Sequence, residues 1–429
     1  MEDRLMQYLL SPVKLKGCVY APPSKSQAHR LLLAAIPAKG TCVIEHVAFS
    51  DDMIASFNAI KALGKNLEVE TESLGNRITI HPQSNISSTP VIDCKESGST
   101  LRFSIPLALA VTGSAVFKGE GRLGSRPLMV YEELFKEKDI LWEADPEGLP
   151  LHVKGKLKPG IFRVRGDISS QFITGLLLAL PLLEGESVLE IEGVLESAPY
   201  VDITLDVLRK YGVIAAEEER HKKYRIPGNQ IFQGVTERVE GDWSQAAFHI
   251  LGGILGEGVC INGLDGSSCQ GDKRIVSLLH SMGADIRWDG DGLVARPSEL
   301  IGMAMDISDC PDLAPVLALA CCLAKGNSRI TGAKRLRMKE SDRIQSVGST
   351  LVALGAKVQC TDDGFEIDGV EFLQGGRVSS HNDHRIAMMV AIAAGACNEF
   401  VFLDGAEAVA KSYPDFWEHY KLLGGSIYE

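Results

Sequence analysis

The sequence predicts an α/β fold built from six repeats, and three observations support that prediction. Polar residues followed by an apolar stretch of small side chains recur about every 72 residues, as in repeat architectures. An amphipathic segment follows each apolar stretch, and most of these segments end in glycine, which is typical of helices with left-handed C-caps. Strand-like segments fill the intervals, including a hairpin pattern around Asp362-Asp363-Gly364. Each repeat is therefore expected to fold as βαβαββ.

The two series of helices are expected to differ in burial. The apolar series is rich in Ala, Leu and Gly on all sides, so we expect buried helices that pack against each other. The expected apolar ranges are 23–35, 96–110, 167–182, 241–255, 310–324 and 382–396. The expected amphipathic ranges are 50–64, 125–138, 199–212, 271–284, 340–356 and 413–425. Six equal units in 429 residues favour two domains of three repeats each.

Composition argues against several functional classes. The net charge of −12 disfavours nucleic acid as the main partner, because phosphate backbones attract basic surfaces. No apolar run reaches the roughly 18 to 20 residues that a membrane span needs, and residues 1–17 lack the pattern of a signal peptide. Ten cysteines without CxxC spacing predict reduced, buried thiols. These features together predict a cytoplasmic protein.

Positively charged residues gather at the expected helix starts. A helix start carries partial positive charge and unpaired N–H groups, so a cation there is unfavourable unless an anion joins it. In an acidic protein this arrangement predicts the binding of small, multiply charged anions. The cations are Lys25, Arg30, Arg102, Arg126, Lys339, Arg343, Arg385 and Lys411.

Three segments of the C-terminal half have both a structural and a functional interpretation. Residues 336–344 suit a solvated helix start with Glu340 as an ordinary first-turn acid, although the flanking cations favour a binding site. Arg385 opens a wholly apolar helix, where it has no evident solvent-facing role, and this favours function. Asp312 suits an N-cap, and an ionised carboxylate there could also act as a base.

The N-terminal half offers three weaker signals. Lys25 and Ser26 beside Arg30 could form a phosphate nest, but without the glycines of a Walker loop they do not imply nucleotide binding. Residues 169–171 suit a helix cap or an oxyanion site equally well. Gly98 would let a ligand approach the backbone closely.

Metal and acyl-enzyme chemistry find no support in the sequence. His249, His280 and His384 do not have the spacing of a metal site, and no HExxH or Gly-x-Ser-x-Gly motif is present. We therefore predict neither metal chemistry nor acyl-enzyme chemistry.

Taken in order, these motifs resemble the enolpyruvyl transferase family, and within it the 3-phosphoshikimate 1-carboxyvinyltransferases (5-enolpyruvylshikimate-3-phosphate synthases). The resemblance covers the whole chain. Its motifs are PPSKSQAHRLLLAA, SGSTLR, GSRPL, SSQF, SAPYVDIT, VEGD, PDLAP, LRMKESDR, DHRIAM and KSYPDF. It implies a two-domain inside-out α/β barrel of six βαβαββ repeats, three per domain. Residues 21–239 would form one domain and residues 1–20 plus 240–429 the other, with the active site in the cleft between them.

The resemblance also implies a reaction. Enzymes of this family transfer the enolpyruvyl group of phosphoenolpyruvate to the 5-hydroxyl of shikimate 3-phosphate and release phosphate, in the shikimate pathway of aromatic amino acid biosynthesis. They use no cofactor or metal and close their domains on the two substrates. We expect a monomer whose partners are these small molecules, and Gly98 would leave room for the herbicide glyphosate.

Site residues are implied where this sequence matches the family's motifs. Asp312 would accept the hydroxyl proton and Glu340 would protonate the methylene carbon, with Lys25 also catalytic. The residues implied for phosphoenolpyruvate are Lys25, Gly98, Arg126, Gln171, Arg343, Arg385 and Lys411. The residues implied for shikimate 3-phosphate are Lys25, Ser26, Arg30, Ser169, Ser170, Gln171, Ser197, Tyr200, Asp312 and Lys339.

The chain departs from the family pattern at three positions. Glu96 and Ser99 stand where many members have Asn and Thr, and Arg335 stands where some have Asn. Three other functions remain as alternatives. A UDP-N-acetylglucosamine 1-carboxyvinyltransferase would typically have Lys-Asn in place of Lys25-Ser26 and a reactive Cys near Arg126. An RNA 3′-phosphate cyclase is opposed by the acidic balance, and a non-catalytic anion-binding protein would not need two carboxylates at the site.

Overall fold

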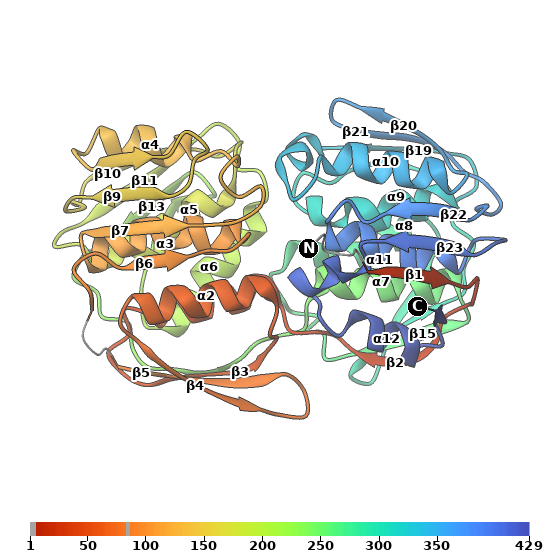
Figure 1. Cartoon of the computed structure of the whole chain (residues 1–429), viewed down its shortest axis with the longest axis horizontal. Helices are drawn as coiled ribbons and strands as arrows, with labels where there is room; N and C mark the ends of the chain where they lie inside the picture. Colours follow the sequence, from red (N-terminus) through yellow and green to blue (C-terminus); the bar gives the residue numbers. More distant parts are fainter. Residues whose placement is uncertain (1–5, 83–85, 429) are drawn as a thin grey trace. The chain divides into compact units, whose positions relative to one another are not determined.

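The computed structural model describes residues 6–82 and 86–428, which divide into two compact units (Figure 1). The N-terminal unit is Pro23–Val239. The C-terminal unit consists of the described residues of Met1–Pro22 and Glu240–Glu429. The chain therefore passes from one unit to the other twice, near Pro22 and near Val239.

The N-terminal unit contains three repeats of helices and strands. Its helices are α1 (Lys25–Ala34), α2 (Asp51–Ala62), α3 (Gly98–Val111), α4 (Met129–Lys136), α5 (Ser170–Ala179), the 3₁₀ turn η1 (Leu180–Leu182) and α6 (Ala198–Lys210). Its strands are β3 (Cys42–Val47), β4 (Asn66–Thr71), β5 (Asn76–His81), β6 (Val91–Asp93), β7 (Ser114–Lys118), β8 (Leu141–Ala144), β9 (Leu151–Lys154), β10 (Ile161–Arg165), β11 (Ser187–Glu192), β12 (Ala216–Glu219), β13 (Lys223–Ile226) and β14 (Thr236–Arg238).

The C-terminal unit has the same composition of elements. Its helices are α7 (Trp243–Leu255), η2 (Gly271–Lys273), α8 (Arg274–Ser281), η3 (Pro311–Leu313), α9 (Ala314–Cys322), η4 (Lys334–Met338), α10 (Arg343–Ala353), α11 (His384–Ala394), η5 (Ala406–Lys411) and α12 (Phe416–Leu422). Its strands are β1 (Gln7–Leu10), β2 (Lys16–Tyr20), β15 (Gly258–Asn262), β16 (Asp285–Asp289), β17 (Gly292–Arg296), β18 (Ala304–Asp306), β19 (Asn327–Thr331), β20 (Lys357–Thr361), β21 (Gly364–Asp368), β22 (Gly376–Ser379), β23 (Val401–Asp404) and β24 (Ile427–Tyr428).

Among the described residues, the strands form six four-stranded sheets with one common plan. In each sheet, two strands pair in parallel and the remaining two pair antiparallel, as in the order β18-β19-β21-β20. Three sheets are completed by strands distant in the sequence. In one of them, β2 pairs in parallel with β15. β14, at the end of the N-terminal unit, pairs with β3 near its beginning, and β1 pairs with β23 and β24. In each unit, therefore, a strand from its first segment pairs with a strand from its last segment.

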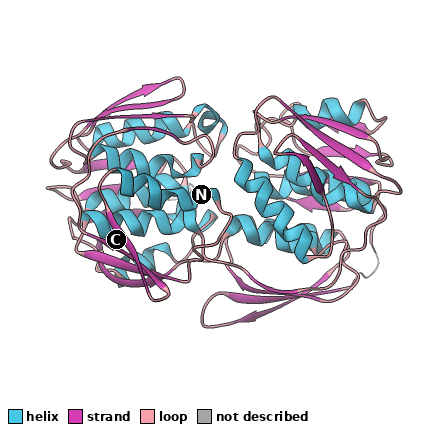
Figure 2. Ribbon diagram, turned by 180° about the vertical axis from the view of Figure 1, so that it is seen from behind, coloured by secondary structure: helices cyan, strands magenta, loops and turns pink. Residues whose placement is uncertain are grey.

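The apolar helices lie inside each unit and the sheets lie outside, as Figure 2 shows. Every residue of α9 and α11 is buried, which confirms the expectation for the apolar series. The amphipathic α8 buries only Ile275, Leu278 and Leu279, which lie on one face. This arrangement confirms the α/β fold with buried apolar helices that the repeats predict, and the inside-out architecture that the resemblance implies.

Polar residues at the repeat positions mostly cap the apolar helices. Ser24, Ser97, Ser169, Asp242 and Asp383 each accept a backbone N–H of the helix that follows. These caps explain where the helices begin and leave the following residues at the helix start.

The prediction that Asp312 is an N-cap is wrong. It lies within η3, Leu313 precedes α9, and no side chain caps that helix. The Asp312 carboxylate is instead held by cations, as described below.

Two further expectations concern membranes and thiols. No helix among residues 6–82 and 86–428 is long and apolar enough to cross a bilayer. None of the ten cysteines, all of which lie in the described part of the chain, forms a disulfide bond. The expectation that they are buried is wrong for Cys18 and Cys269, which are exposed.

Candidate active site

Arg343, the first residue of α10, is the centre of a charged cluster in the C-terminal unit. Its Nε donates to Asp383 Oδ2 at 2.8 Å and its Nη1 to Asp312 Oδ1 at 2.9 Å. Its Nη2 donates to Glu340 Oε2 at 2.6 Å. The Arg343 side chain is 1% exposed, and its planar guanidinium offers donors in fixed directions. Arg343 therefore fixes three carboxylates relative to one another.

Three cations surround the carboxylate of Asp312. Besides Arg343, Arg385 Nη2 lies 3.2 Å from Oδ2 and Lys339 Nζ lies 3.5 Å from Oδ1. Burial disfavours the charged form of Asp312, but these cations outweigh that effect and hold its pKa well below its ordinary value. Asp312 is therefore ionised at neutral pH. Burial lowers the pKa of Lys339, and the neighbouring Asp312 carboxylate opposes that shift.

The remaining predicted cation of this unit, Lys411, lies close to the start of α11. Lys411 Nζ donates to the carbonyl oxygen of Asn382 at 3.1 Å, and Arg385 is the second residue of α11. The structure therefore gathers all six predicted residues of the C-terminal unit around the starts of α10 and α11. They are Asp312, Lys339, Glu340, Arg343, Arg385 and Lys411.

In the N-terminal unit, the starts of α3 and α5 are joined by hydrogen bonds to Gln171. Arg102 Nη1 donates to Gln171 Oε1 at 2.5 Å, and Gln171 Nε2 donates to Ser99 Oγ at 2.9 Å. Arg126 lies against the same helix start, because a Cβ atom on Gly98 would be 2.8 Å from its Nη1. The absence of a side chain at Gly98 is thus what allows the guanidinium of Arg126 to approach.

Arg30 is held by neutral oxygens. Its Nε donates to Thr204 Oγ1 at 2.8 Å and its Nη2 to Thr174 Oγ1 at 3.2 Å. Its Nη1 donates to the Ser26 carbonyl at 2.7 Å. The guanidinium carbon also lies 5.8 Å from the ring centre of Tyr200. Arg30 therefore ties the start of α1 to α5 and α6.

The other predicted residues of this unit also lie at helix starts. Lys25, the first residue of α1, pairs with Asp52 in the first turn of α2 at 2.9 Å. Ser169 caps α5, and Ser170 is the first residue of that helix. Ser197 precedes α6 with φ of 57°, a left-handed conformation that is uncommon for serine.

The three departures from the family pattern have distinct environments. The Glu96 carboxylate points at Gly121, where an added Cβ atom would overlap it. The Ser99 hydroxyl accepts the hydrogen bond from Gln171 described above. Arg335 Nη2 donates to the Ser308 carbonyl at 3.0 Å.

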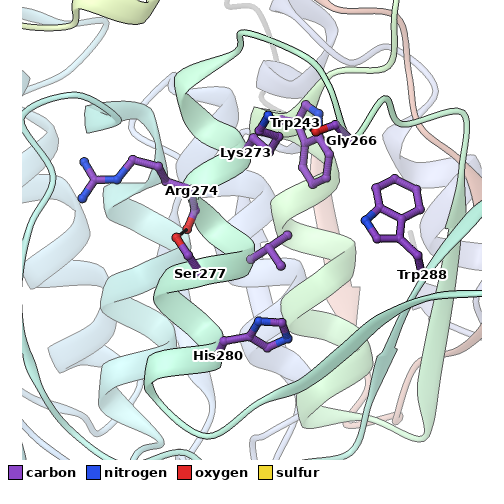
Figure 3. Close-up of a pocket in the computed structure, with 8 residues that line it drawn as sticks. Trp243, Gly266, Lys273, Arg274, Ser277, His280 and Trp288 are labelled. Atoms are coloured by element: carbon purple, nitrogen blue, oxygen red, sulfur yellow. Dashed lines mark hydrogen bonds between the residues drawn. The ribbon is translucent and has the colours of Figure 1, made fainter.

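A pocket of about 320 Å³ lies elsewhere on the C-terminal unit, beside α8 (Figure 3). Trp243 and Trp288 line it together with Lys273, Arg274 and His280, and none of the predicted site residues does. Within the described part of the chain, no group of three or more His, Cys, Asp or Glu could hold a metal ion.

Comparison with known proteins gives the family. The sequence profile described as EPSP synthase (3-phosphoshikimate 1-carboxyvinyltransferase) matches residues 10–420. The chain belongs to the EPSP synthase family. A Clostridium kluyveri protein named 3-phosphoshikimate 1-carboxyvinyltransferase is 46% identical over 426 residues, which are 99% of each chain. A Clostridium perfringens protein of that name is 44% identical over 425 residues, again 99% of each chain.

Solved structures agree with the EPSP synthase family. The EPSP synthase from Acinetobacter baumannii has a TM-score of 0.80 and 26% identity, with 99% of this chain and 100% of that chain covered. The fold is thus shared over the full length.

Sequence reasoning about this EPSP synthase family member missed several contacts. Arg102 was expected only to bind anions, yet it also orients Gln171. Asp383, which caps α11, also holds Arg343, a contact that the sequence did not indicate. The sequence places Asp52 at a helix start but does not indicate that it pairs with Lys25.

Proposed function

We propose that this protein transfers the enolpyruvyl group of phosphoenolpyruvate to the 5-hydroxyl of shikimate 3-phosphate and releases inorganic phosphate, in the shikimate pathway. One observation carries the proposal. In a chain of this family, a single buried guanidinium, that of Arg343, holds Asp312 and Glu340 together. The reaction needs one group that accepts a proton from the alcohol and one that donates a proton to carbon, and two adjacent carboxyl groups can divide these tasks.

The reaction consists of an addition and an elimination. In the addition, Asp312 accepts the 5-hydroxyl proton as that oxygen bonds to the central carbon of phosphoenolpyruvate. Glu340, in its protonated form, delivers a proton to the methylene carbon, which becomes a methyl group. In the elimination, the ionised Glu340 takes a proton back from the methyl group, the carbon–carbon double bond re-forms and the phosphate leaves with the bonding electron pair. The proton that Asp312 accepted from the 5-hydroxyl passes to the released phosphate, so both carboxyl groups return to their starting states.

Substrate binding would prepare Asp312 for its role. The carboxylate of phosphoenolpyruvate would pair with Arg343 and Arg385, and the residues proposed for shikimate 3-phosphate include Lys339. These are the cations that keep the pKa of Asp312 low. When bound anions compensate their charge, the carboxylate of Asp312 becomes more basic, because its ionised form loses stabilisation.

The phosphate groups would be held mainly by the N-terminal unit. For phosphoenolpyruvate we propose Lys25, Gly98, Arg126 and Gln171, joined by Lys411. For shikimate 3-phosphate we propose Lys25, Ser26, Arg30, Ser169, Ser170, Gln171, Ser197, Tyr200, Asp312 and Lys339. Neutral hydroxyls and helix N–H groups suit a phosphate dianion, and the cations balance its charge.

The two sets of residues would form one site in a cleft between domains 21–239 and 1–20 plus 240–429, which would close on the substrates. We further propose a cytoplasmic monomer without metal or cofactor. Size-exclusion chromatography with light scattering of the purified protein tests the monomer; a dimer mass would contradict it.

Phosphate release from phosphoenolpyruvate tests the function, in parallel assays with shikimate 3-phosphate and with UDP-N-acetylglucosamine and no added metal. Release only with shikimate 3-phosphate is expected. Release only with the nucleotide sugar would identify the other transferase. No release with either, although the anions bind, would indicate a non-catalytic anion-binding protein.

A further inference from the structure

Cys18 and Cys260 form a pair of thiols on the outer face of one sheet in the C-terminal unit. Cys18 lies in β2 and Cys260 in β15, and the parallel register of these strands places the two residues opposite each other (Figure 1). The next residues of the two strands, Val19 and Ile261, are buried, so both cysteines point away from the core. Cys18 is exposed and Cys260 is half-buried. A reagent in solution can therefore reach the pair.

The strand geometry suits a disulfide bond between these thiols. Neighbouring strands lie about 4.8 Å apart, and the Cα atoms of a disulfide usually lie about 4.4 to 6.8 Å apart. Side chains of register partners leave the sheet on the same side. The two thiols also interact directly, since burial and then a hydrogen bond with Cys18 raise the pKa of the Cys260 thiol.

The Cys260 side chain can turn toward Cys18. Its Sγ lies 3.8 Å from Oδ1 of Asn262, two residues along the same strand. A Cβ atom on Gly292 of β17 would lie 2.7 Å from this sulfur. Because β15 lies between β17 and β2, the sulfur of reduced Cys260 is on the β17 side of its strand. One side-chain torsion with staggered minima separates that position from one on the β2 side.

A bond at this place would fasten an edge strand. Among the described strands, only β15 pairs with β2, which leads directly to the first crossing of the chain between the units. Beyond β2, the Ala21 N–H donates to the Asn262 carbonyl at 2.8 Å, and the Pro22 carbonyl accepts the Asp242 N–H at 2.8 Å. The loop closed by the bond would contain the whole N-terminal unit, Pro23–Val239.

We propose that Cys18 and Cys260 form a reversible disulfide bond when the protein meets a small disulfide oxidant such as glutathione disulfide. The exposed thiolate of Cys18 attacks one sulfur of the oxidant, and one glutathione leaves as its thiolate. Cys260 then loses its proton and attacks Cys18 Sγ, and the second glutathione leaves. Two protein thiols are thereby oxidised, the oxidant is reduced to two thiols, and these take up the two protons. A dithiol reductant reverses the reaction.

Mass spectrometry of the whole protein, after incubation with glutathione disulfide, tests the bond. The parent protein carries Cys269→Ser, which removes the other exposed thiol. This parent should lose two hydrogen atoms. With Cys260→Ser added it should instead gain one glutathione, because the intermediate on Cys18 has no resolving thiol. With Cys18→Ser added it should react more slowly, since Cys260 is half-buried.

Trypsin digestion locates the bond. Cleavage leaves Cys18 in peptide 17–25 and Cys260 in peptide 239–273, which also contains position 269, so the Cys269→Ser change makes the assignment unique. The two peptides should be joined after oxidation and separate after treatment with dithiothreitol. An unchanged mass, a lasting glutathione adduct on Cys18 while Cys260 is present, or a bond between two chains would overturn the proposal.

Unfolding in urea measures what the bond does. The oxidised parent should unfold at a higher urea concentration than the reduced parent, because the bond restricts the unfolded chain and a long loop increases that effect. The Cys18→Ser and Cys260→Ser variants should unfold at the same urea concentration with and without glutathione disulfide. An unchanged or lower midpoint in the oxidised parent would overturn the stabilising role. None of these measurements depends on the proposed function, because none uses its substrates.

Discussion

The two units hold the arginines at their helix starts in different ways. In the N-terminal unit, Arg30 and Arg102 donate to hydroxyl, amide and carbonyl oxygens. In the C-terminal unit, Arg343 donates to carboxylates, among them Asp312 and Asp383. Neutral oxygens orient a guanidinium without cancelling its charge, whereas carboxylates cancel it. The N-terminal arrangement therefore favours anion binding, and the C-terminal one brings together groups that can exchange protons.

The helix caps follow the same division. Ser24, Ser97 and Ser169 cap the apolar helices of the N-terminal unit. Asp242 and Asp383 cap α7 and α11 of the C-terminal unit. A serine satisfies the helix N–H groups without a charge that would repel a phosphate, while an aspartate does so with one. Equivalent positions of one repeat have thus been adapted to two kinds of chemistry.

The largest effect should come from removing the proposed base of the C-terminal unit. Asp312→Asn keeps the shape but removes the proton acceptor, so kcat for phosphate release should fall by about 10² to 10⁴. Shikimate 3-phosphate should still bind, as measured by calorimetry, because the N-terminal residues are unchanged. Asp291→Asn is the matched control. Unchanged turnover in Asp312→Asn would remove this residue from the mechanism and weaken the division between the units.

A pair of variants compares the stability of the two arrangements. Asp383→Ala leaves the buried Arg343 without one carboxylate and α11 without its cap. The free energy of unfolding should fall by about 3 to 5 kcal/mol, as for other broken buried ion pairs. Thr204→Val removes a neutral partner of Arg30 and should cost about 1 to 3 kcal/mol. Urea unfolding measures both, and equal losses would contradict the comparison.

Much of the fold could be predicted because its signals are local. Apolar periodicity, N-caps and C-terminal glycines such as Gly64 and Gly355 recur in each repeat, and both glycines have the positive φ that this pattern predicts. The closure of the units could not be predicted from the residues alone. The pairing of β14 with β3 joins segments nearly 200 residues apart, and neither strand has a pattern that identifies its partner.

The candidate site was predictable to a similar extent. A cation at the start of an apolar helix is unusual in any single sequence, so Arg385 could be recognised directly. The partners of these cations depend on which helix starts converge, and that is a property of the folded chain. For this reason the sequence did not indicate that Asp383 is the partner of Arg343.

The smallest expected effect concerns binding in the N-terminal unit. A methyl group on Gly98 would lie 2.8 Å from Arg126 Nη1, the end of a flexible side chain that can move aside. Gly98→Ala should therefore fold normally but displace the guanidinium from the proposed phosphate position. We expect KM for phosphoenolpyruvate to rise about tenfold with little change in kcat, since uniform binding is lost rather than transition-state stabilisation.

The control is Gly185→Ala in the same unit, where the added methyl group would contact the Pro159 side chain. It should leave both kinetic constants unchanged. Asp312→Asn should lower kcat, whereas Gly98→Ala should raise KM. The two variants together therefore test whether the two units have different tasks. A large fall in kcat in Gly98→Ala would instead mean that Arg126 stabilises the departing phosphate. The N-terminal unit would then contribute to the chemical step as well as to binding.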